Sequence, residues 1–190
     1  MNEIMNEIKT RQAQEPEIII NIATPKDAEA LSQIKQRVWL TTYQNKELAI
    51  TAEDILTKDF LCKQRIEKRA EHMGTNDSTN RTLVARAGTQ IAGYGRAVKG
   101  ADVHEIVTLY LLPEWQGRGI GSNLLKRLLD WLGDEKVVTL GVASFNTPAI
   151  RFYEKFGFRL GKQILHDEAT FPSGKDLPEI QMLLAKPTSY

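Results

Sequence analysis

Six consecutive residues, Gln116–Gly121 (QGRGIG), place three glycines around an arginine. Glycine turns the backbone sharply without a Cβ clash and lets it come close to a ligand. The residues that follow have the periodicity of a helix, and the amides and positive dipole end of a helix start bind anions. Arg118 adds a positive charge to the same turn. The segment therefore predicts a site for an anionic ligand.

The alternative is a tight strand-to-helix turn without a ligand. The G-x-G-x-G spacing differs from the dinucleotide-binding fingerprint, and the segment lacks the Lys-Ser/Thr pair of a P-loop. The elements around the turn are clearer. Glu105–Leu112 has the β-branched and apolar residues of a strand, which Pro113 ends because proline has no amide donor. After Gly119 an apolar residue recurs every fourth position, as on one helix face, at Ile120, Leu124, Leu128 and Leu132.

The whole stretch Glu105–Leu132 resembles the acetyl-CoA motif of the GCN5-related N-acetyltransferase (GNAT) superfamily. A second stretch, Asn146–Phe158 (NTPAIRFYEKFGF), is similar to the next motif of that superfamily. The two stretches occur in the family's order and about the family's distance apart. The resemblance favours the ligand site over the empty turn, and it implies acetyl-CoA as cosubstrate.

The resemblance also implies which residues hold acetyl-CoA. The strand backbone at Leu109–Leu111 would bind the pantetheine arm and present an amide to the oxyanion of the thioester carbonyl. Asn146 would contact the cofactor, cap the next helix, or do both. The cofactor-binding residues predicted in this way are Leu109, Tyr110, Leu111, Gln116, Gly117, Arg118, Gly119, Ile120, Gly121, Ser122, Asn146 and Tyr153.

Two residues are candidates for catalysis. Tyr153 aligns with the tyrosine that many family members use as a general acid toward the departing thiolate, and a phenol with a pKa of about 10 is protonated at neutral pH. The alternative is an aromatic ring packed between Ile150 and Phe156. Glu105 lies thirteen residues before Arg118, the offset of the catalytic glutamate in histone-acetylating members. The alternative is that Glu105 is a solvated surface group and that a chain of water molecules takes the proton from the amine.

Strand alternation predicts that Glu105 shares a face with Val107, Leu109 and Leu111, and that His104 lies on the opposite, solvated side. Among the other histidines, His166 on a closing strand could approach the acceptor site. His72 ends a charged helix. Since no Cys/His cluster occurs, the sequence predicts no metal site.

For the acceptor, the resemblance points to Trp39 and Tyr43, which occupy the region where the family's first two helices shape the acceptor pocket. The alternative for this aromatic pair is core or rim packing. Ribosomal-protein N-terminal acetyltransferases of the family have a glutamate five residues before the motif asparagine, where this chain has Gly141. That difference argues against such a substrate.

Composition limits the class of protein. The 190 residues fit one domain, expected over residues 18–187 after a flexible tail over residues 1–17. Twenty-five basic and 24 acidic residues give a net charge of +1, which indicates neither a nucleic-acid nor a membrane partner. The single cysteine, Cys62, excludes an internal disulfide, and no apolar run is long enough for a membrane span. A cytoplasmic protein is expected, and a homodimer is left open.

The order of predicted elements is β-αα-βββ-α-β-α-ββ, an α+β class. It includes a hairpin around Gly88–Gln90 and one helix from Thr51 through Met73. The resemblance implies a single-domain GNAT fold, with a mixed, twisted sheet of six or seven strands and about four helices. In that fold the fourth and fifth strands separate to admit the cofactor.

The predicted function is that of an acetyl-CoA-dependent N-acetyltransferase, in which a primary amine attacks the thioester directly in a ternary complex. A small amine or polyamine is the expected acceptor. The alternatives are a protein or peptide acceptor, with a lysine or N-terminal amine, and a non-catalytic module that binds acetyl-CoA.

Overall fold

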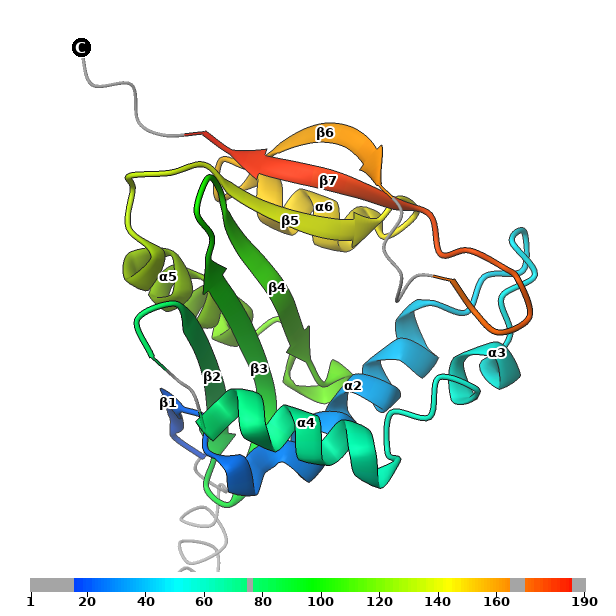
Figure 1. Ribbon diagram of the computed structural model, residues 1–190, viewed down its shortest axis with the longest axis horizontal. Coiled ribbons are helices and arrows are strands. Elements are labelled where there is room, and N and C mark those ends of the chain that lie inside the picture. The colour runs from blue at the N-terminus through cyan, green and yellow to red at the C-terminus, as the bar shows by residue number, and fades with distance from the viewer. Residues whose placement is uncertain (1–15, 75–76, 165–169, 186–190) are drawn as a thin grey trace, which may run out of the picture.

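The computed structural model describes residues 16–74, 77–164 and 170–185. The predicted tail over residues 1–17 lies almost wholly outside this range, as does His166. Within the described residues, one seven-stranded sheet runs through the molecule with helices on both faces (Figure 1). The predicted α+β fold with a mixed sheet is confirmed.

The sheet has the strand order β1-β2-β3-β4-β5-β7-β6. All neighbouring strands are antiparallel except β4 and β5, which are parallel. The predicted hairpin is formed by β2 and β3. The strands are β1 (Ile18–Ile22), β2 (Asn80–Ala87), β3 (Gln90–Lys99), β4 (His104–Leu111), β5 (Val138–Ala143), β6 (Arg159–Ile164) and β7 (Glu179–Leu184).

Helices cover both faces because alternate residues of the central strands point to opposite sides. Leu83 and Ile106 pack on the side of α5 and α6, whereas Val84 and Tyr94 pack on the side of α2 and α4. No helix among the described residues has the length and apolar content needed to cross a membrane. The helical elements are η1 (Pro25–Asp27), α2 (Ala28–Thr42), α3 (Ala52–Leu56), α4 (Lys63–Gly74), η2 (Pro113–Trp115), α5 (Ile120–Leu132) and α6 (Thr147–Glu154).

The prediction of one long helix from Thr51 onward is wrong, because residues 57–62 separate α3 from α4. Asp59 has a φ of 44°, in the left-handed region that a right-handed helix cannot contain. The preceding Lys58 is buried, and its ammonium donates a hydrogen bond of 2.6 Å to the carbonyl oxygen of Thr170. A contact with a distant loop therefore accompanies the break, which local helical periodicity does not reveal.

β4 and β5 diverge along most of their length (Figure 1). Their ladder consists of two pairs, His104 with Val138 and Glu105 with Thr139. Beyond them, the β4 edge over Ile106–Leu111 that faces β5 has no strand partner among the described residues. The predicted separation of the fourth and fifth strands is confirmed, and it leaves backbone groups available to an extended ligand.

A bulge in β4 changes the faces of its residues. Ala97 of β3 pairs with Ile106, and Arg96 pairs with Thr108, which leaves Val107 as the extra residue. A bulge shifts the alternation of all residues that follow it.

The prediction that Glu105 shares a face with Val107, Leu109 and Leu111 is therefore partly wrong. Leu109 and Leu111 pack toward α5, while Glu105, Thr108 and Tyr110 line a cavity on the other side of the sheet. Val107 also lines this cavity, as predicted. Because the bulge forms only when β3 pairs with β4, alternation along β4 alone could not predict it.

His104 is buried, with 4% of its surface exposed, so the prediction of a solvated side chain is also wrong. Its carbonyl oxygen accepts a hydrogen bond of 3.3 Å from Thr139 Oγ1 on the neighbouring β5. Burial, together with the nearby charges of Lys136 and Lys99, lowers the pKa of His104. The imidazole is therefore a neutral core group.

Candidate functional site

The glycine turn between η2 and α5 has the geometry of an open backbone cradle. Gly117 and Gly119 have φ values of 75° and 77°, in the region that favours glycine. A Cβ at either position would meet no other heavy atom within 4 Å, so the space beside both residues is empty. Gly119 is the N-cap of α5, and no side chain among the described residues caps it. The first amides of α5 therefore remain available to an anion.

Two side chains shape this turn. The Arg118 guanidinium lies over the Trp115 ring, 5.0 Å from its centroid, which keeps the positive charge beside the helix start. Gln116 Nε2 donates a hydrogen bond of 3.2 Å to the carbonyl oxygen of Leu111, the last residue of β4. The turn is thus joined to the end of the strand whose edge is open toward β5.

α6 lies on the opposite side of the gap. Asn146 caps it, because its Oδ1 accepts a hydrogen bond of 3.2 Å from the Ala149 amide, which confirms the predicted capping role. A Cβ at Gly121 would lie 3.8 Å from the ring of Phe152, so the start of α5 approaches the second half of α6. The start of α5, the helix α6 and the free edge of β4 therefore border the opening.

Tyr153 of α6 is buried, with 8% of its surface exposed. Its ring contacts those of Phe152 and Phe158 edge-on, at centroid distances of 5.2 and 5.8 Å. Burial raises the pKa of the Tyr153 phenol, and the neighbouring Tyr43 raises it further. Tyr153 is therefore an aromatic core residue whose phenol stays protonated at neutral pH.

Aromatic residues connect α2 to β4. Trp39 Nε1–H donates a hydrogen bond of 2.9 Å to the Tyr110 hydroxyl, and the Tyr43 ring meets Trp39 edge-on at 4.9 Å. Burial and the charge of Glu179 raise the pKa of Tyr43 to about 12, although a hydrogen bond with Tyr110 acts in the opposite direction. This network fixes one wall of the cavity beside β4.

That cavity has a volume of about 710 Å³, the size of a small-molecule site. Glu105 and Trp39 both line it, whereas Tyr43 stands behind Trp39 and lies outside the lining. Gly141 also lines it, from β5. The structure thus brings Glu105, Trp39 and Tyr110 together, on the opposite side of the sheet from α5.

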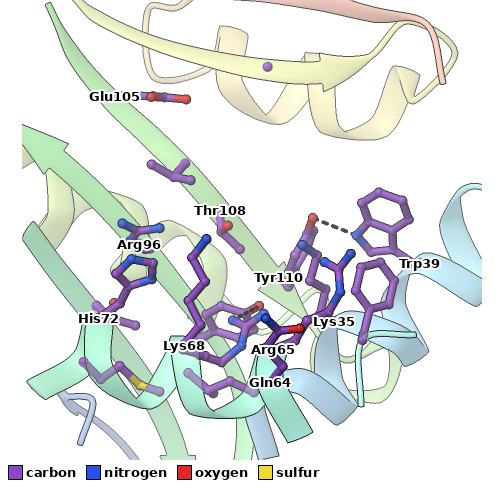
Figure 2. A pocket seen from close by; sticks show the side chains of 18 of the residues that line it. Lys35, Trp39, Gln64, Arg65, Lys68, His72, Arg96, Glu105, Thr108 and Tyr110 are labelled. Carbon is purple, nitrogen blue, oxygen red and sulfur yellow. Dashed lines mark hydrogen bonds between the residues drawn. The ribbon is translucent and has the colours of Figure 1, made fainter. Parts of the chain in front are cut away.

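Sequence reasoning missed most of the lining on α4. Arg65, Lys68, Arg69 and His72 face the cavity, which is shown in Figure 2. They occur at i, i+3, i+4 and i+7, the spacing of one helix face. That spacing is the one signal in the sequence that these residues share a helix face. A basic helix face is ordinarily solvated, so the spacing alone does not predict a cavity.

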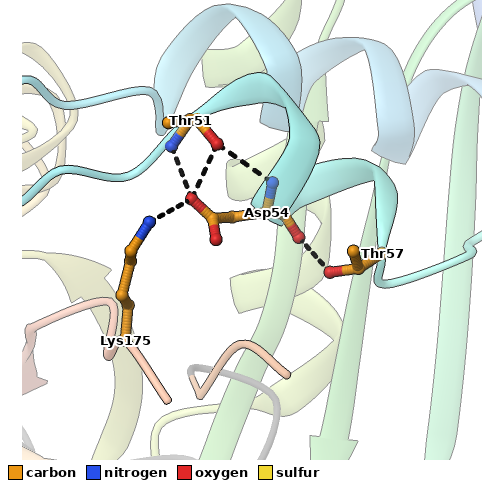
Figure 3. A network of polar contacts seen from close by, with 4 residues as sticks. All are labelled: Thr51, Asp54, Thr57 and Lys175. Atoms are coloured by element: carbon orange, nitrogen blue, oxygen red, sulfur yellow. Dashed lines mark hydrogen bonds and ion pairs between the residues drawn. The ribbon is translucent and has the colours of Figure 1, made fainter. Parts of the chain in front are cut away.

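A loop before β7 contacts α3 through a network of polar contacts (Figure 3). Lys175 Nζ donates a hydrogen bond of 2.8 Å to Asp54 Oδ2, which also accepts from the Thr51 amide and hydroxyl at 2.8 Å each. Hydrogen bonds from Lys175, Ser173 and Thr51 lower the pKa of Asp54. The Phe171 ring of the same loop lies beneath Lys58 Nζ, 4.9 Å from it. The loop is thus held to α3 by ionic and aromatic contacts.

Comparison with known proteins identifies the family. The model of the acetyltransferase (GNAT) family matches residues 39–158, more than half of the chain. The chain belongs to the GNAT family. The match includes β4, the glycine turn, α5, β5 and α6, so the divergent strands and the open turn of this GNAT chain lie within the family domain.

Individual relatives support this assignment. An uncharacterized N-acetyltransferase of Mycobacterium tuberculosis is 37% identical over 87 residues, 44% of this chain and 56% of that protein. The chain thus spans about half the length of this curated relative. The L-2,4-diaminobutyric acid acetyltransferase of Streptomyces coelicolor is 28% identical over 138 residues, 61% of this chain and 81% of that protein. The crystal structure of PaiA N-acetyltransferase from Thermoplasma acidophilum, in complex with coenzyme A, has a TM-score of 0.63 at 22% identity. The superposition covers 90% of this chain and 99% of the PaiA chain, so the two proteins share the GNAT fold.

Proposed function

We propose that this GNAT protein is an acetyl-CoA-dependent N-acetyltransferase that acetylates a small primary amine by direct attack in a ternary complex. The observation that supports this most strongly is the continuity of the open β4 edge, Ile106–Leu111, with the glycine turn. An extended chain that ends in a diphosphate fits such a path, because the strand edge offers hydrogen bonds and the helix start favours the anion.

The residues present fit acetyl-CoA, which supplies the thioester when bound. Backbone amides over Gln116–Ser122 would hold the diphosphate, assisted by the Arg118 charge. The backbone of Leu109–Leu111 would hold the pantetheine arm and direct an amide at the carbonyl oxygen. Asn146, which caps α6 at the other side of the gap, would border the arm.

Glu105 is proposed to take the first proton, directly or through water, from the ammonium of the acceptor. Its position supports this, because it lines the acceptor cavity and belongs to the last pair before β4 and β5 separate. The neutral nitrogen then forms the new C–N bond while the C–S bond breaks. Backbone amides of Leu109–Leu111 stabilise the negative charge on the carbonyl oxygen during this change.

Tyr153 is proposed to give its phenolic proton to the departing sulfur and to recover a proton from the acetylated nitrogen. A phenol is protonated at neutral pH, which is the form that the step needs. The products are an N-acetylated amine and coenzyme A, with one proton passed to solvent. Trp39 forms part of the acceptor wall, and Tyr43 supports that wall from behind.

The acceptor cavity favours a small amine over a protein. At about 710 Å³ it lies within the range of small-molecule pockets, and elements on several sides surround it, namely α2, α4, β3 and β4. The L-2,4-diaminobutyric acid acetyltransferase named above is a relative that is named for a small amine as its acceptor.

Acceptor-dependent release of coenzyme A tests the function. Wild type, Tyr153→Phe and Glu105→Gln would be assayed with a panel of small amines, polyamines and peptides, and coenzyme A binding would be measured by calorimetry. We expect turnover by wild type, a fall in kcat of about 10²–10⁴-fold in Tyr153→Phe, and unchanged coenzyme A affinity. Coenzyme A binding without turnover of any amine would instead favour a sensor, and no binding would refute the proposal.

A further inference from the structure

Charge is distributed unevenly around the acceptor cavity. Among the described residues, five basic side chains line it, against two carboxylates, although the whole chain has a net charge of only +1. Figure 2 shows Glu105 on β4 at one end of the cavity and the basic side chains of α4 at the other. The basic residues are Lys35, Arg65, Lys68, Arg69 and Arg96.

Arg69 is held in place without a carboxylate. Its Nε donates to Ser32 Oγ at 3.1 Å, and its Nη1 donates to the Tyr94 hydroxyl at 3.1 Å. The guanidinium also lies 5.7 Å from the centre of the Tyr94 ring. These partners are neutral, and Arg69 forms no ion pair within the described part of the chain. Its orientation is fixed, and no carboxylate of the described residues pairs with its charge.

Arg96, on β3, is oriented by a buried amide. Its Nε donates to Asn80 Oδ1 at 3.0 Å, and Asn80 Nδ2 donates in turn to the His72 carbonyl oxygen at 3.0 Å. Asn80 is buried, with 9% of its surface exposed. The arrangement connects β3 to α4 and directs a second guanidinium to the same cavity.

Lys68 and Arg65 contribute more flexible charge at the mouth of the cavity. Both are exposed, and neither has an ion pair within residues 16–74, 77–164 and 170–185. Burial and the charges of Arg96 and Lys68 lower the pKa of His72, which lies among them. A positive field of this kind repels polycations and attracts oxyanions.

We infer that the acceptor is a zwitterionic amine, a small molecule with a primary amine at one end and a carboxylate or phosphate at the other. Arg69, Arg96 and Lys68 bind the oxyanion, and the amine lies toward Glu105. Guanidinium groups suit this role because their paired N–H donors match the oxygens of both groups. The inference rests on the proposed acetyltransferase function and narrows it away from polyamines.

Matched acceptors that differ only in the anion provide the test. The pairs are lysine with cadaverine, which lacks the carboxylate, and phosphoethanolamine with ethanolamine, which lacks the phosphate. We expect kcat/KM to be at least about tenfold higher for one anionic member, since a charged hydrogen-bonded pair discriminates by that factor. A preference for lysine would indicate a carboxylate site, and a preference for phosphoethanolamine would indicate a phosphate site. Higher kcat/KM for cadaverine or spermidine would overturn the inference.

Charge variants locate the contact. Lys68→Glu and Arg69→Gln should each reduce the preference for the anionic acceptor about tenfold or more, without change in coenzyme A affinity. Lys63→Glu is the matched control, because Lys63 is on the same helix, is 89% exposed, and does not line the cavity. A preference that survives both cavity variants would place the anion elsewhere and refute the assignment.

A binding measurement separates this inference from the proposed function. Calorimetry on the coenzyme A complex compares lysine with cadaverine and phosphoethanolamine with ethanolamine, the analogues that lack the anion, and NMR follows the His72 imidazole. A bound anion should raise the pKa of His72, because it offsets the charges that lower it. Selective anion binding without turnover would refute catalysis alone, whereas turnover of polyamines alone would refute only the zwitterionic acceptor.

Discussion

Replacing Gly119 by alanine separates the stability of the glycine turn from its role in binding. Gly119 has φ 77° and ψ −2°, a left-handed conformation that costs an alanine about 1–2 kcal/mol. No heavy atom lies within 4 Å of the Cβ position, so no clash with the protein adds to this cost. The free energy of unfolding should therefore fall by about 1–2 kcal/mol.

The effect on coenzyme A affinity should be larger. The new Cβ occupies the open space in which the diphosphate is proposed to meet the first amides of α5. Loss of one hydrogen bond to a charged group costs about 1.5–3 kcal/mol, so the dissociation constant should rise by about 10- to 150-fold. Urea titration gives the stability, and isothermal calorimetry with coenzyme A gives the affinity.

Gly133→Ala is the control for this experiment. Gly133 has a φ of 80° and an open Cβ position, and it ends the same helix about 20 Å from the turn. This variant should lose at least as much stability and keep the affinity of wild type. If Gly119→Ala is destabilised yet binds coenzyme A within about twofold of wild type, the diphosphate does not bind at this turn.

Three further predictions concern the fold around the site. Leu128→Ala removes a side chain with 0% exposure and should lower the free energy of unfolding in urea by about 2–5 kcal/mol. Tyr110→Phe leaves Trp39 Nε1–H without its acceptor and should cost about 1–3 kcal/mol, visible also as a change in Trp fluorescence. Lys175→Met breaks the ion pair with Asp54, whose pKa is lowered in the folded protein. A lowered pKa of a carboxyl stabilises the fold above the ordinary pKa of 3.8, and this stabilisation is lost as the pH falls toward the pKa of the folded state. The stability gap between wild type and Lys175→Met should thus be widest at neutral pH and shrink below pH 3.8, and a constant gap would contradict this.

The amino-acid sequence by itself determined the elements of the cofactor side. The strand before Pro113, the glycines of the turn and the apolar repeat after Gly119 follow from local conformational preferences, which act over a few residues. The family motif in Glu105–Leu132 adds the order of the remaining elements. These features are local, so the same predictions match β4 and α5 to within a residue or two.

Only the tertiary structure decided the faces and the charge of the acceptor side. The Val107 bulge arises from pairing between β3 and β4, and His104 lies against β5. Alternation along one strand therefore predicted neither the face of Leu109 and Leu111 nor the burial of His104. The basic cavity joins Arg69 of α4 to Arg96 of β3, which the chain separates by a loop and a strand. Composition averages these cations against acids elsewhere in the chain, whereas an electrostatic field depends on which charges the fold places together.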